Sequence, residues 1–257
     1  MAFNRRDGEY RSKEKANFIY GIHSITEAID AGREIDKIFI QNGLGGELIV
    51  NLKRKLKDHD IVYNGVPIET LNRITRSNHQ GAIAYISEIN YFNVEDILPQ
   101  LFEEGQVPFF LILDRITDVR NFGAICRTAY SAGIDAIIVP FKGGAPASAD
   151  AVKTSAGALS KIKVCRSPNL KYIINFLKES GVQIIACTEK SEKMYTSMDF
   201  TKPTAIIMGS EEDGVSAEYL RLCDSRAMIP MIGDLGSLNV SVATGIILYE
   251  LVRQRIG

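Results

Sequence analysis

Histidine and cysteine are scarce in this chain, and their placement excludes several kinds of catalytic site. All three histidines lie before residue 80, and the four cysteines are widely spaced without any C-x-x-C pair. The usual zinc and redox signatures are therefore missing. We interpret the cysteines as reduced thiols buried in the fold. We expect no metal site, and no histidine-based triad in the C-terminal half of the chain.

Long apolar runs are missing as well. The sequence has no apolar stretch of about 18 residues, the length that a membrane-spanning helix needs. The N-terminal residues MAFNRRDGEYRSKEKANF contain no apolar signal core. We therefore expect a cytoplasmic protein that neither enters a membrane nor is secreted.

Two common nucleotide-binding motifs are also absent. No Walker-type G-x-x-x-x-G-K-[ST] occurs. The nearest match to the dinucleotide fingerprint is GLGG at residues 43–46, where Leu48 occupies the place of the third glycine. Because that glycine is needed for close packing of the helix against the strand, we interpret the segment as a turn.

The overall charge does not indicate nucleic-acid binding, since 30 basic and 31 acidic residues leave a formal net charge of −1. Two local basic groups carry more information. They are Lys53, Arg54, Lys55 and Lys57, and, within the acid-free residues 151–166, Lys153 and Lys161. Each group is typical either of a solvated helix face or of a surface that contacts RNA phosphates.

Composition and periodicity divide the chain into four segments. Residues 1–17 are polar and aperiodic, which predicts a disordered, weakly basic arm. Residues 18–88 alternate helical and strand patterns and predict a small α/β domain. Residues 89–105 are interpreted as a linker that carries one acidic amphipathic helix. The pattern restarts at the apolar run FFLIL, so residues 106–257 are predicted to form a second domain.

The second domain is predicted to contain a mostly parallel sheet. Its expected strands are 109–113, 136–139, 162–165, 183–187, 204–208 and 227–231. Helices are expected to begin near Asn121, Ala149, Asn169 and Ala217, and after Asn239. Continuous apolar strands that alternate with helices are typical of an α/β sheet covered on both faces.

Ligands of such sheets bind at the carboxyl ends of the strands, and three polar, glycine-bearing segments follow expected strands. In the first, residues 114–127, Asn121 lies at the expected start of a helix and Arg127 on its second turn. Read alone, these residues are a helix cap and a surface cation. They are also candidates for a polar site.

The other two segments are residues 208–216 and 230–245. In the former, three acids at 211–213 stand between two glycines directly after an apolar strand. Such acids are either solvated or positioned to orient a polar substrate. In the latter, SLNVS brings two serines and an asparagine to the entry of the last helix. Capping accounts for one of these residues, but not for all three.

Together the three segments resemble the signature motifs of the SpoU family, also called TrmH, of RNA ribose 2'-O-methyltransferases. The motifs are N-x-G-x-x-x-R at 121–127, MGSEEDG at 208–214, and IPM followed by SLNVSVA at 229–243. Residues 106–257 resemble the catalytic domain of the family. Residues 18–88, which contain YGIH and HQGAIA, resemble its substrate-binding domain, which has a fold similar to ribosomal protein L30e. The combination is closest to the bacterial members that methylate a guanosine of large-subunit ribosomal RNA.

The resemblance implies S-adenosylmethionine as methyl donor, a structured RNA as substrate, a C-terminal trefoil knot and a homodimer. It implies an active site made of Asn121, Arg127, Glu211, Ser237 and Asn239. It also implies a cofactor site with Gly209, Ile229 and Leu238, to which we add Thr188 and Glu189 because they follow the fourth strand.

A ribose 2'-hydroxyl is a poor nucleophile until its proton leaves, so positioning is expected to supply much of the rate. Arg127 is expected to anchor the phosphate of the target and to pair with Glu211. The proton acceptor is then the phosphate or an atypically deprotonated Arg127. The neighbouring acids at 212 and 213 leave open which carboxylate faces the site.

Three other functions remain alternatives at this point. A transfer RNA is a second class of substrate for a ribose methyltransferase. A non-catalytic RNA-binding protein, such as a ribosome assembly factor, would keep the fold without needing every polar residue of the motifs. An α/β enzyme that acts on a small nucleotide is disfavoured by the missing glycine fingerprint and by the additional N-terminal domain.

Overall fold

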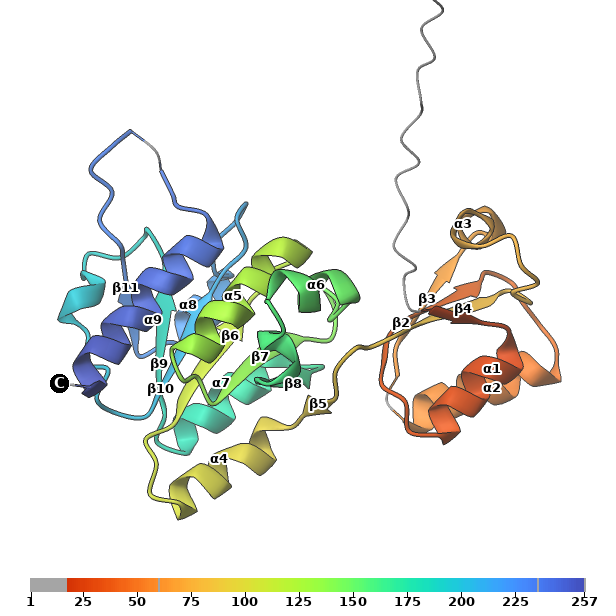
Figure 1. The fold of residues 1–257 in the computed structure, drawn as a ribbon, viewed down its shortest axis with the longest axis horizontal. Coiled ribbons are helices and arrows are strands. Elements are labelled where there is room, and N and C mark those ends of the chain that lie inside the picture. The colour runs from red at the N-terminus through yellow and green to blue at the C-terminus, as the bar shows by residue number, and fades with distance from the viewer. Residues whose placement is uncertain (1–17, 60, 235, 257) are drawn as a thin grey trace, which may run out of the picture. The chain divides into compact units, whose positions relative to one another are not determined.

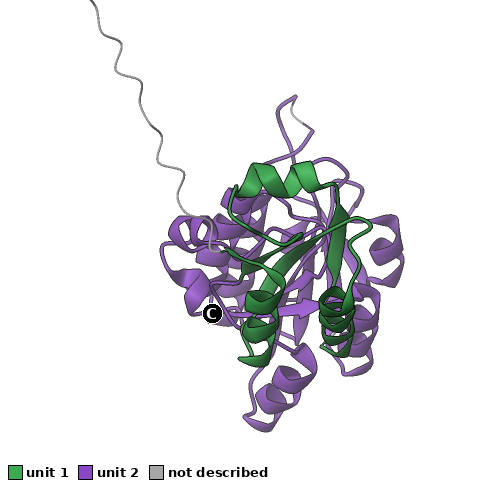
Figure 2. Cartoon of the chain, turned by 90° about the vertical axis from the view of Figure 1, so that its right-hand side faces the viewer, with its two compact units in different colours: residues 1–86 green, residues 87–257 purple. Residues whose placement is uncertain are grey.

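The computed structural model describes residues 18–59, 61–234 and 236–256, and it divides the chain into two compact units between residues 86 and 87 (Figure 2). The arm expected at residues 1–17 lies outside the described residues. Each unit has its own sheet and its own apolar core. No helix in the described part has the length and apolar character needed to cross a membrane.

The first unit is built on a four-stranded sheet with the order β1-β4-β2-β3. Strands β2 and β3 are parallel, whereas β4 pairs antiparallel with both β1 and β2. In chain order the elements are β1 (Phe18–Tyr20), α1 (Ile22–Asp30), β2 (Ile35–Gln41), α2 (Glu47–Asp58), β3 (Tyr63–Val66), α3 (Ile68–Ile74) and β4 (Ala82–Ile86). Buried residues at helical spacing, such as Ile49, Leu52 and Leu56 of α2, form the core between helices and sheet.

The YGIH and HQGAIA segments meet in one turn of this unit. Gln80 Oε1 accepts a hydrogen bond from Ile22 N at 3.1 Å. The buried His79 accepts from Gly81 N through Nδ1 at 3.0 Å, so its Nε2 carries the proton that faces Asn72 Oδ1, also at 3.0 Å. These two motifs therefore have a structural role, because they connect β4 to the start of α1 and to α3.

The second unit is a parallel, seven-stranded sheet with the order β11-β9-β10-β6-β7-β8-β5. Its strands are β5 (Tyr91–Phe92), β6 (Phe109–Leu113), β7 (Ala136–Pro140), β8 (Lys163–Ser167), β9 (Gln183–Cys187), β10 (Thr204–Met208) and β11 (Ser225–Ala227). Its α-helices are α4 (Val94–Glu103), α5 (Val119–Ser131), α6 (Ala149–Thr154), α7 (Leu170–Glu179), α8 (Ala217–Leu222) and α9 (Val240–Ile256), with short 3₁₀ turns at Ala158–Ser160 and Tyr195–Ser197. This arrangement confirms the predicted α/β class and parallel sheet, while the trefoil knot stays a prediction.

Strand β6 shows why both faces of this sheet have to be covered. Phe109, Leu111 and Leu113 belong to the core beneath α5 and α9, whereas Phe110 and Ile112 belong to the core beneath α4 and α7 (Figure 1). All five side chains are almost completely buried. Because alternate side chains of this strand enter two apolar cores, every position is apolar, which explains the continuous apolar run in the sequence.

Residues 89–105, which were expected to form a linker, pack into the second unit. Strand β5 pairs in parallel with β8 and adds an edge strand to the sheet. Helix α4 buries Val94, Ile97, Leu98 and Leu101 against the sheet. The amphipathic pattern predicts the helix, but periodicity alone does not reveal which surface covers its apolar face.

The last strand also differs from its expected position. A strand was expected at residues 227–231, but β11 ends at Ala227 and pairs with β9. Pro230 lacks the backbone N–H that a sheet ladder requires. Residues 229 and 231 instead line the cavity described below.

The packing of α4 leads to a stability prediction. We expect Leu98→Ala to lower the free energy of unfolding of the second unit by about 2–5 kcal/mol, because Leu98 is buried in its core. The matched control is Gln100→Ala on the exposed side of the same helix, with an expected change within about 0.5 kcal/mol. Urea unfolding followed by circular dichroism measures both. Equal stability of the two variants would show that residues 89–105 are only a linker.

Candidate active site

A cavity of about 500 Å³ lies at the carboxyl ends of β9 and β10. It is lined by residues 187–190, 208–214, 229, 231, 236–238, 240 and 243. The residues that we expected to hold a cofactor, Thr188, Glu189, Gly209, Ile229 and Leu238, all line this cavity. Parallel strands bring these distant segments together because their carboxyl ends meet at one edge of the sheet.

Gly209 allows the loop after β10 to fold back on itself. An added Cβ at this position would lie 2.0 Å from the Gly214 carbonyl carbon and 2.1 Å from Val215 N. Gly214 N donates a hydrogen bond to Ser210 O at 3.0 Å, and Gly214 has a left-handed φ of 68°. Two glycines are thus required for different reasons, one for close backbone approach and one for backbone conformation.

Asp114 and Arg115, at the end of β6, hold the far side of this loop. Arg115 donates to Asp114 Oδ1 at 3.0 Å, to Asp213 Oδ2 at 2.9 Å and to Gly214 O at 3.2 Å. The other carboxylate oxygen of Asp114 accepts from Ser216 N at 2.7 Å. Asp114 is only 2% exposed, so its charge depends on these donors for compensation.

Asn121, Glu211 and Asn239 form a closed hydrogen-bonded group, which we call the polar triad. Asn121 Nδ2 donates to Glu211 Oε1 at 2.9 Å, and Asn239 Nδ2 donates to the same oxygen at 2.7 Å and to Asn121 Oδ1 at 3.0 Å. Asp118 caps α5 by accepting from Asn121 N at 2.8 Å. The side-chain oxygen of Asn239 accepts a hydrogen bond from the Ser241 hydroxyl at 2.6 Å.

The three acids at 211–213 therefore have different surroundings. Glu211 belongs to the triad, while Asp213 forms an ion pair with Arg115 on the other side of the loop. Glu212 is exposed. Because the turn between Gly209 and Gly214 is so tight, neighbouring side chains of the loop point in different directions.

Arg127 does not join the polar triad within this chain. Its side chain is exposed on α5, and no ion pair links it to Glu211 or to another described residue. Positions six residues apart on a helix differ in direction by about 120° and by about 9 Å along the axis. Arg127 is therefore on a different side of α5 from Asn121, and its expected pairing with Glu211 is not formed within this chain and stays a prediction.

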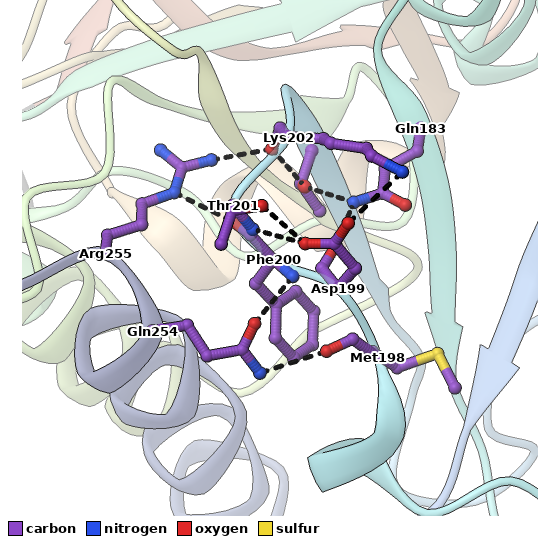
Figure 3. A network of polar contacts seen from close by, with 9 residues as sticks. Gln183, Met198, Asp199, Phe200, Thr201, Lys202, Gln254 and Arg255 are labelled. Atoms are coloured by element: carbon purple, nitrogen blue, oxygen red, sulfur yellow. Dashed lines mark hydrogen bonds and ion pairs between the residues drawn. The ribbon is translucent and has the colours of Figure 1, made fainter. Parts of the chain in front are cut away.

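The C-terminal end of α9 is tied to the loop before β10 (Figure 3). Gln254 accepts from Phe200 N at 2.9 Å and donates to Met198 O at 3.0 Å. Arg255 donates to Phe200 O and Lys202 O, each at 2.9 Å. These bonds anchor the helix whose first residues complete the cavity and the triad.

Cys187 lines the cavity but is unsuited to act as a nucleophile. Burial raises the pKa of its thiol to about 12. The thiol is therefore neutral at physiological pH, and a thiol reacts as the thiolate. All four cysteines are free; Cys126 and Cys165 are buried as the sequence predicts, whereas Cys187 and Cys223 are only partly buried.

Two family models match this chain. The SpoU rRNA Methylase family model matches residues 108–249, and the RNA 2'-O ribose methyltransferase substrate binding model matches residues 18–92. The chain belongs to the SpoU rRNA methylase family. It is an RNA 2'-O-ribose methyltransferase, as the sequence motifs predict.

Relatives named for ribosomal RNA and for transfer RNA are both similar to this chain. A Staphylococcus saprophyticus protein named as a TrmH family tRNA/rRNA methyltransferase is 34% identical over 92% of this chain and 95% of its own length. The solved structure of an AdoMet-bound rRNA methyltransferase from Sinorhizobium meliloti is 28% identical, with a TM-score of 0.59, and covers 95% of this chain and 89% of that chain. A TrmH/SpoU tRNA modifying enzyme from A. aeolicus is 32% identical, with a TM-score of 0.54, over 63% of this chain and 84% of its own.

The remaining predicted residues belong to both units. Ser237 lines the cavity. Lys153 and Lys161 are exposed, and Lys161 Nζ lies 5.8 Å from the ring centre of Tyr130. The other basic group, residues 53–57, belongs to α2 of the first unit, where Lys53 lies over Tyr63 and Lys55 pairs with Asp30.

Sequence reasoning missed Asp114 and Arg115 as parts of the site. The sequence contains a signal that could have identified them, since a charged pair directly after a completely apolar strand is unusual for a buried sheet. Only the fold shows that Arg115 reaches Asp213, which lies 98 residues later in the chain.

The close approach at Gly209 predicts a strong difference between two glycines of the cavity. We expect Gly209→Ala to lower the free energy of unfolding by at least about 1–3 kcal/mol, because the methyl group would overlap the backbone at 214 and 215. Gly236→Ala is the matched control, since an added Cβ there meets nothing within 4 Å. Denaturant unfolding of both variants measures the difference, and an unchanged Gly209→Ala protein would contradict the tight turn.

Proposed function

We propose that this chain transfers a methyl group from S-adenosylmethionine to the 2'-hydroxyl of a guanosine in large-subunit, 23S ribosomal RNA. The single observation that carries the methyl transfer is the polar triad beside the cavity. The choice of a 23S guanosine follows from the resemblance of the motifs to the bacterial members that methylate that RNA. Binding of RNA alone would not require a carboxylate and two amides locked together at the mouth of a ligand pocket. A non-catalytic assembly factor is therefore the weaker reading.

The cavity suits S-adenosylmethionine in size and in chemistry. Its volume of about 500 Å³ lies within the range of small-molecule pockets. Gly209 lines the cavity, Ile229 and Leu238 offer apolar walls, and Thr188 and Glu189 offer polar groups. When bound, the cofactor supplies a methyl group on a positively charged sulfur. The AdoMet complex of the Sinorhizobium meliloti relative supports this assignment.

In this mechanism the triad positions the ribose. Glu211 is held in one orientation by the two amides of Asn121 and Asn239, which keep its carboxylate at the rim of the cavity. Ser237 adds a hydroxyl from the loop before α9. A fixed geometry of this kind contributes to the rate because the attacking oxygen has to approach the methyl group in line with the departing sulfur.

Arg127 binds the phosphate of the target nucleotide. A guanidinium offers a planar fork that matches phosphate oxygens, and it stays protonated at physiological pH. The phosphate that it holds then accepts the proton that leaves the 2'-hydroxyl. The resemblance to the family implies that Arg127 serves the cavity of a second subunit rather than its own, and its position on a different side of α5 from Asn121 is consistent with this.

Two helices offer a surface for such a homodimer. Helices α5 and α9 contact each other within the chain. On them, Tyr130, Val242 and Tyr249 are 45%, 52% and 52% exposed, whereas Ile247 and Leu251 fill the core of the same chain. Large apolar side chains that remain exposed on adjacent helices support pairing with another copy.

The basic groups at residues 53–57, 153 and 161 supply phosphate contacts that position the RNA without reading its sequence. The RNA itself is identified by experiment. Mapping of 2'-O-methyl sites in RNA from a strain without the gene is expected to reveal one missing methyl group on a large-subunit guanosine. A missing site in transfer RNA would replace the ribosomal substrate, and unchanged methylation of all RNA would favour the assembly factor.

We expect Arg127→Ala to reduce methyl transfer by at least about 100-fold while S-adenosylmethionine affinity stays within a few-fold. The reason is that Arg127 contacts the RNA phosphate and not the cofactor. Arg127→Lys is expected to fail as well, since an ammonium lacks the planar fork. Arg120→Ala, an exposed arginine on the same helix, is the control. Tritiated-methyl transfer and calorimetry measure the two quantities, and equal loss of both would contradict this role.

A shared site predicts complementation between two inactive proteins. Mixing Arg127→Ala with Leu238→Arg, which blocks the cavity, is expected to restore about a quarter of the activity after free subunit exchange. Half of the dimers are then mixed, and each mixed dimer has one site with wild-type elements from both subunits. Absence of rescue despite exchange proven by a tagged subunit would mean that each chain completes its own site.

A further inference from the structure

The first unit has a sheet face that lies away from helices α1 and α2. The core between the sheet and helices α1 and α2 contains Ile38 and Ile40 of β2 and Ala82, Ala84 and Ile86 of β4. Side chains alternate across a strand, so the residues between these point to the opposite face. Figure 1 shows α3 on that opposite side, across the sheet from α1 and α2.

Four aromatic residues gather on this opposite face, and we call them the aromatic row. They are Phe18 and Tyr20 of β1, Phe39 of β2 and Tyr85 of β4. Phe18 pairs with Tyr85 in register, and the ring centres of these two residues are 5.9 Å apart. The row continues to Phe39 on one side, 6.1 Å from Tyr85, and to Tyr20 on the other, 6.3 Å from Phe18.

The row is more open than a core would be. Tyr20 is 39% exposed, and Phe18, Phe39 and Tyr85 are half-buried. Ile83 of β4 is on the same face, in register with Tyr20 on one side and Phe39 on the other, and unlike the rings it is fully buried. Rings that only filled a core would be covered as Ile83 is.

An ammonium group and an amide border the row. The exposed Lys37 holds its ammonium 4.6 Å from the ring centre of Phe39, at the end of the row on β2. Asn64 of β3 is opposite Phe39 in register and is exposed, so an amide continues the same face. Rings for stacking, an amide for base edges and a cation for a phosphate are together typical of surfaces for unpaired RNA.

We propose that the aromatic row binds unpaired bases of the RNA substrate by stacking, with Lys37 on an adjoining phosphate. The proposal rests on the proposed function in one respect, because the unit matches a substrate-binding model of RNA methyltransferases. It names a single-stranded subsite that is separate from the basic helix α2. A second copy of the chain or another protein would bring no phosphate for Lys37.

The test uses the full chain and two fluorescein-labelled probes, a short single-stranded RNA of mixed sequence and the duplex of the same sequence. We expect the single strand to bind more tightly. Tyr20→Leu and Phe39→Leu are each expected to weaken its binding about fivefold or more, since stacking contributes at least about 1 kcal/mol per base. Duplex binding is expected to stay unchanged.

Two variants and one control distinguish stacking from a loss of folding. Tyr20→Phe keeps the ring and is expected to bind like the wild type. Lys37→Gln, at an exposed position, is expected to lower the slope of log affinity against log salt by about 0.7, the value for one phosphate contact on a single strand. Tyr172→Leu, an exposed tyrosine of α7 in the second unit, is the matched control and is expected to bind normally.

The outcomes separate this proposal from the proposed function. Fluorescence anisotropy of the labelled probes measures RNA binding without a methyl donor. Normal single-strand binding with no methyl transfer would therefore contradict only the proposed function. Ring variants that bind the single strand within twofold of the wild type would overturn the subsite. Equal affinity for strand and duplex would also overturn it. Ring variants that change only the sedimentation of the protein would assign this face to another copy of the chain instead.

Discussion

The close backbone contact between Gly209 and residues 214–215 is the constraint on which the rest of the site depends. With no side chain at 209, the loop after β10 returns to its own beginning within five residues. This tight turn directs Glu211 toward α5 and α9, and it directs Asp213 toward the end of β6. A wider loop would separate the carboxylate from both asparagines, because two of the three hydrogen bonds of the triad are accepted by Glu211.

The two sides of the loop are held by different means. On one side the uncharged amides of Asn121 and Asn239 donate hydrogen bonds to Glu211. On the other side Arg115 balances Asp114 and Asp213, and it also bonds the carbonyl of Gly214. The far end of α9 is anchored by Gln254 and Arg255. The loop is thus stabilised without using the carboxylate that faces the cavity.

The position of Arg127 links the chemistry to assembly. Arg127 is on the same helix as Asn121 but on another side, and it does not join the hydrogen bonds around Glu211. The homodimer that we propose through α5 and α9 would bring the arginine of one subunit to the ribose held by the other. Exposed Val242 and Tyr249 are consistent with that arrangement.

Local patterns in the sequence determined the parallel sheet and the start of most helices, because apolar runs and caps act over a few residues, whereas Gly209, Ile229 and Leu238 of the cavity followed from the family resemblance. The family resemblance added the role of Asn121, Glu211 and Asn239. Only the tertiary structure decided that α4 belongs to the second unit, that Pro230 ends the last strand early, and that Asp213 pairs with Arg115. It also decided that Arg127 and Glu211 do not meet in one chain. These facts depend on contacts between segments far apart in sequence, and periodicity contains no information about which distant surface covers a given face.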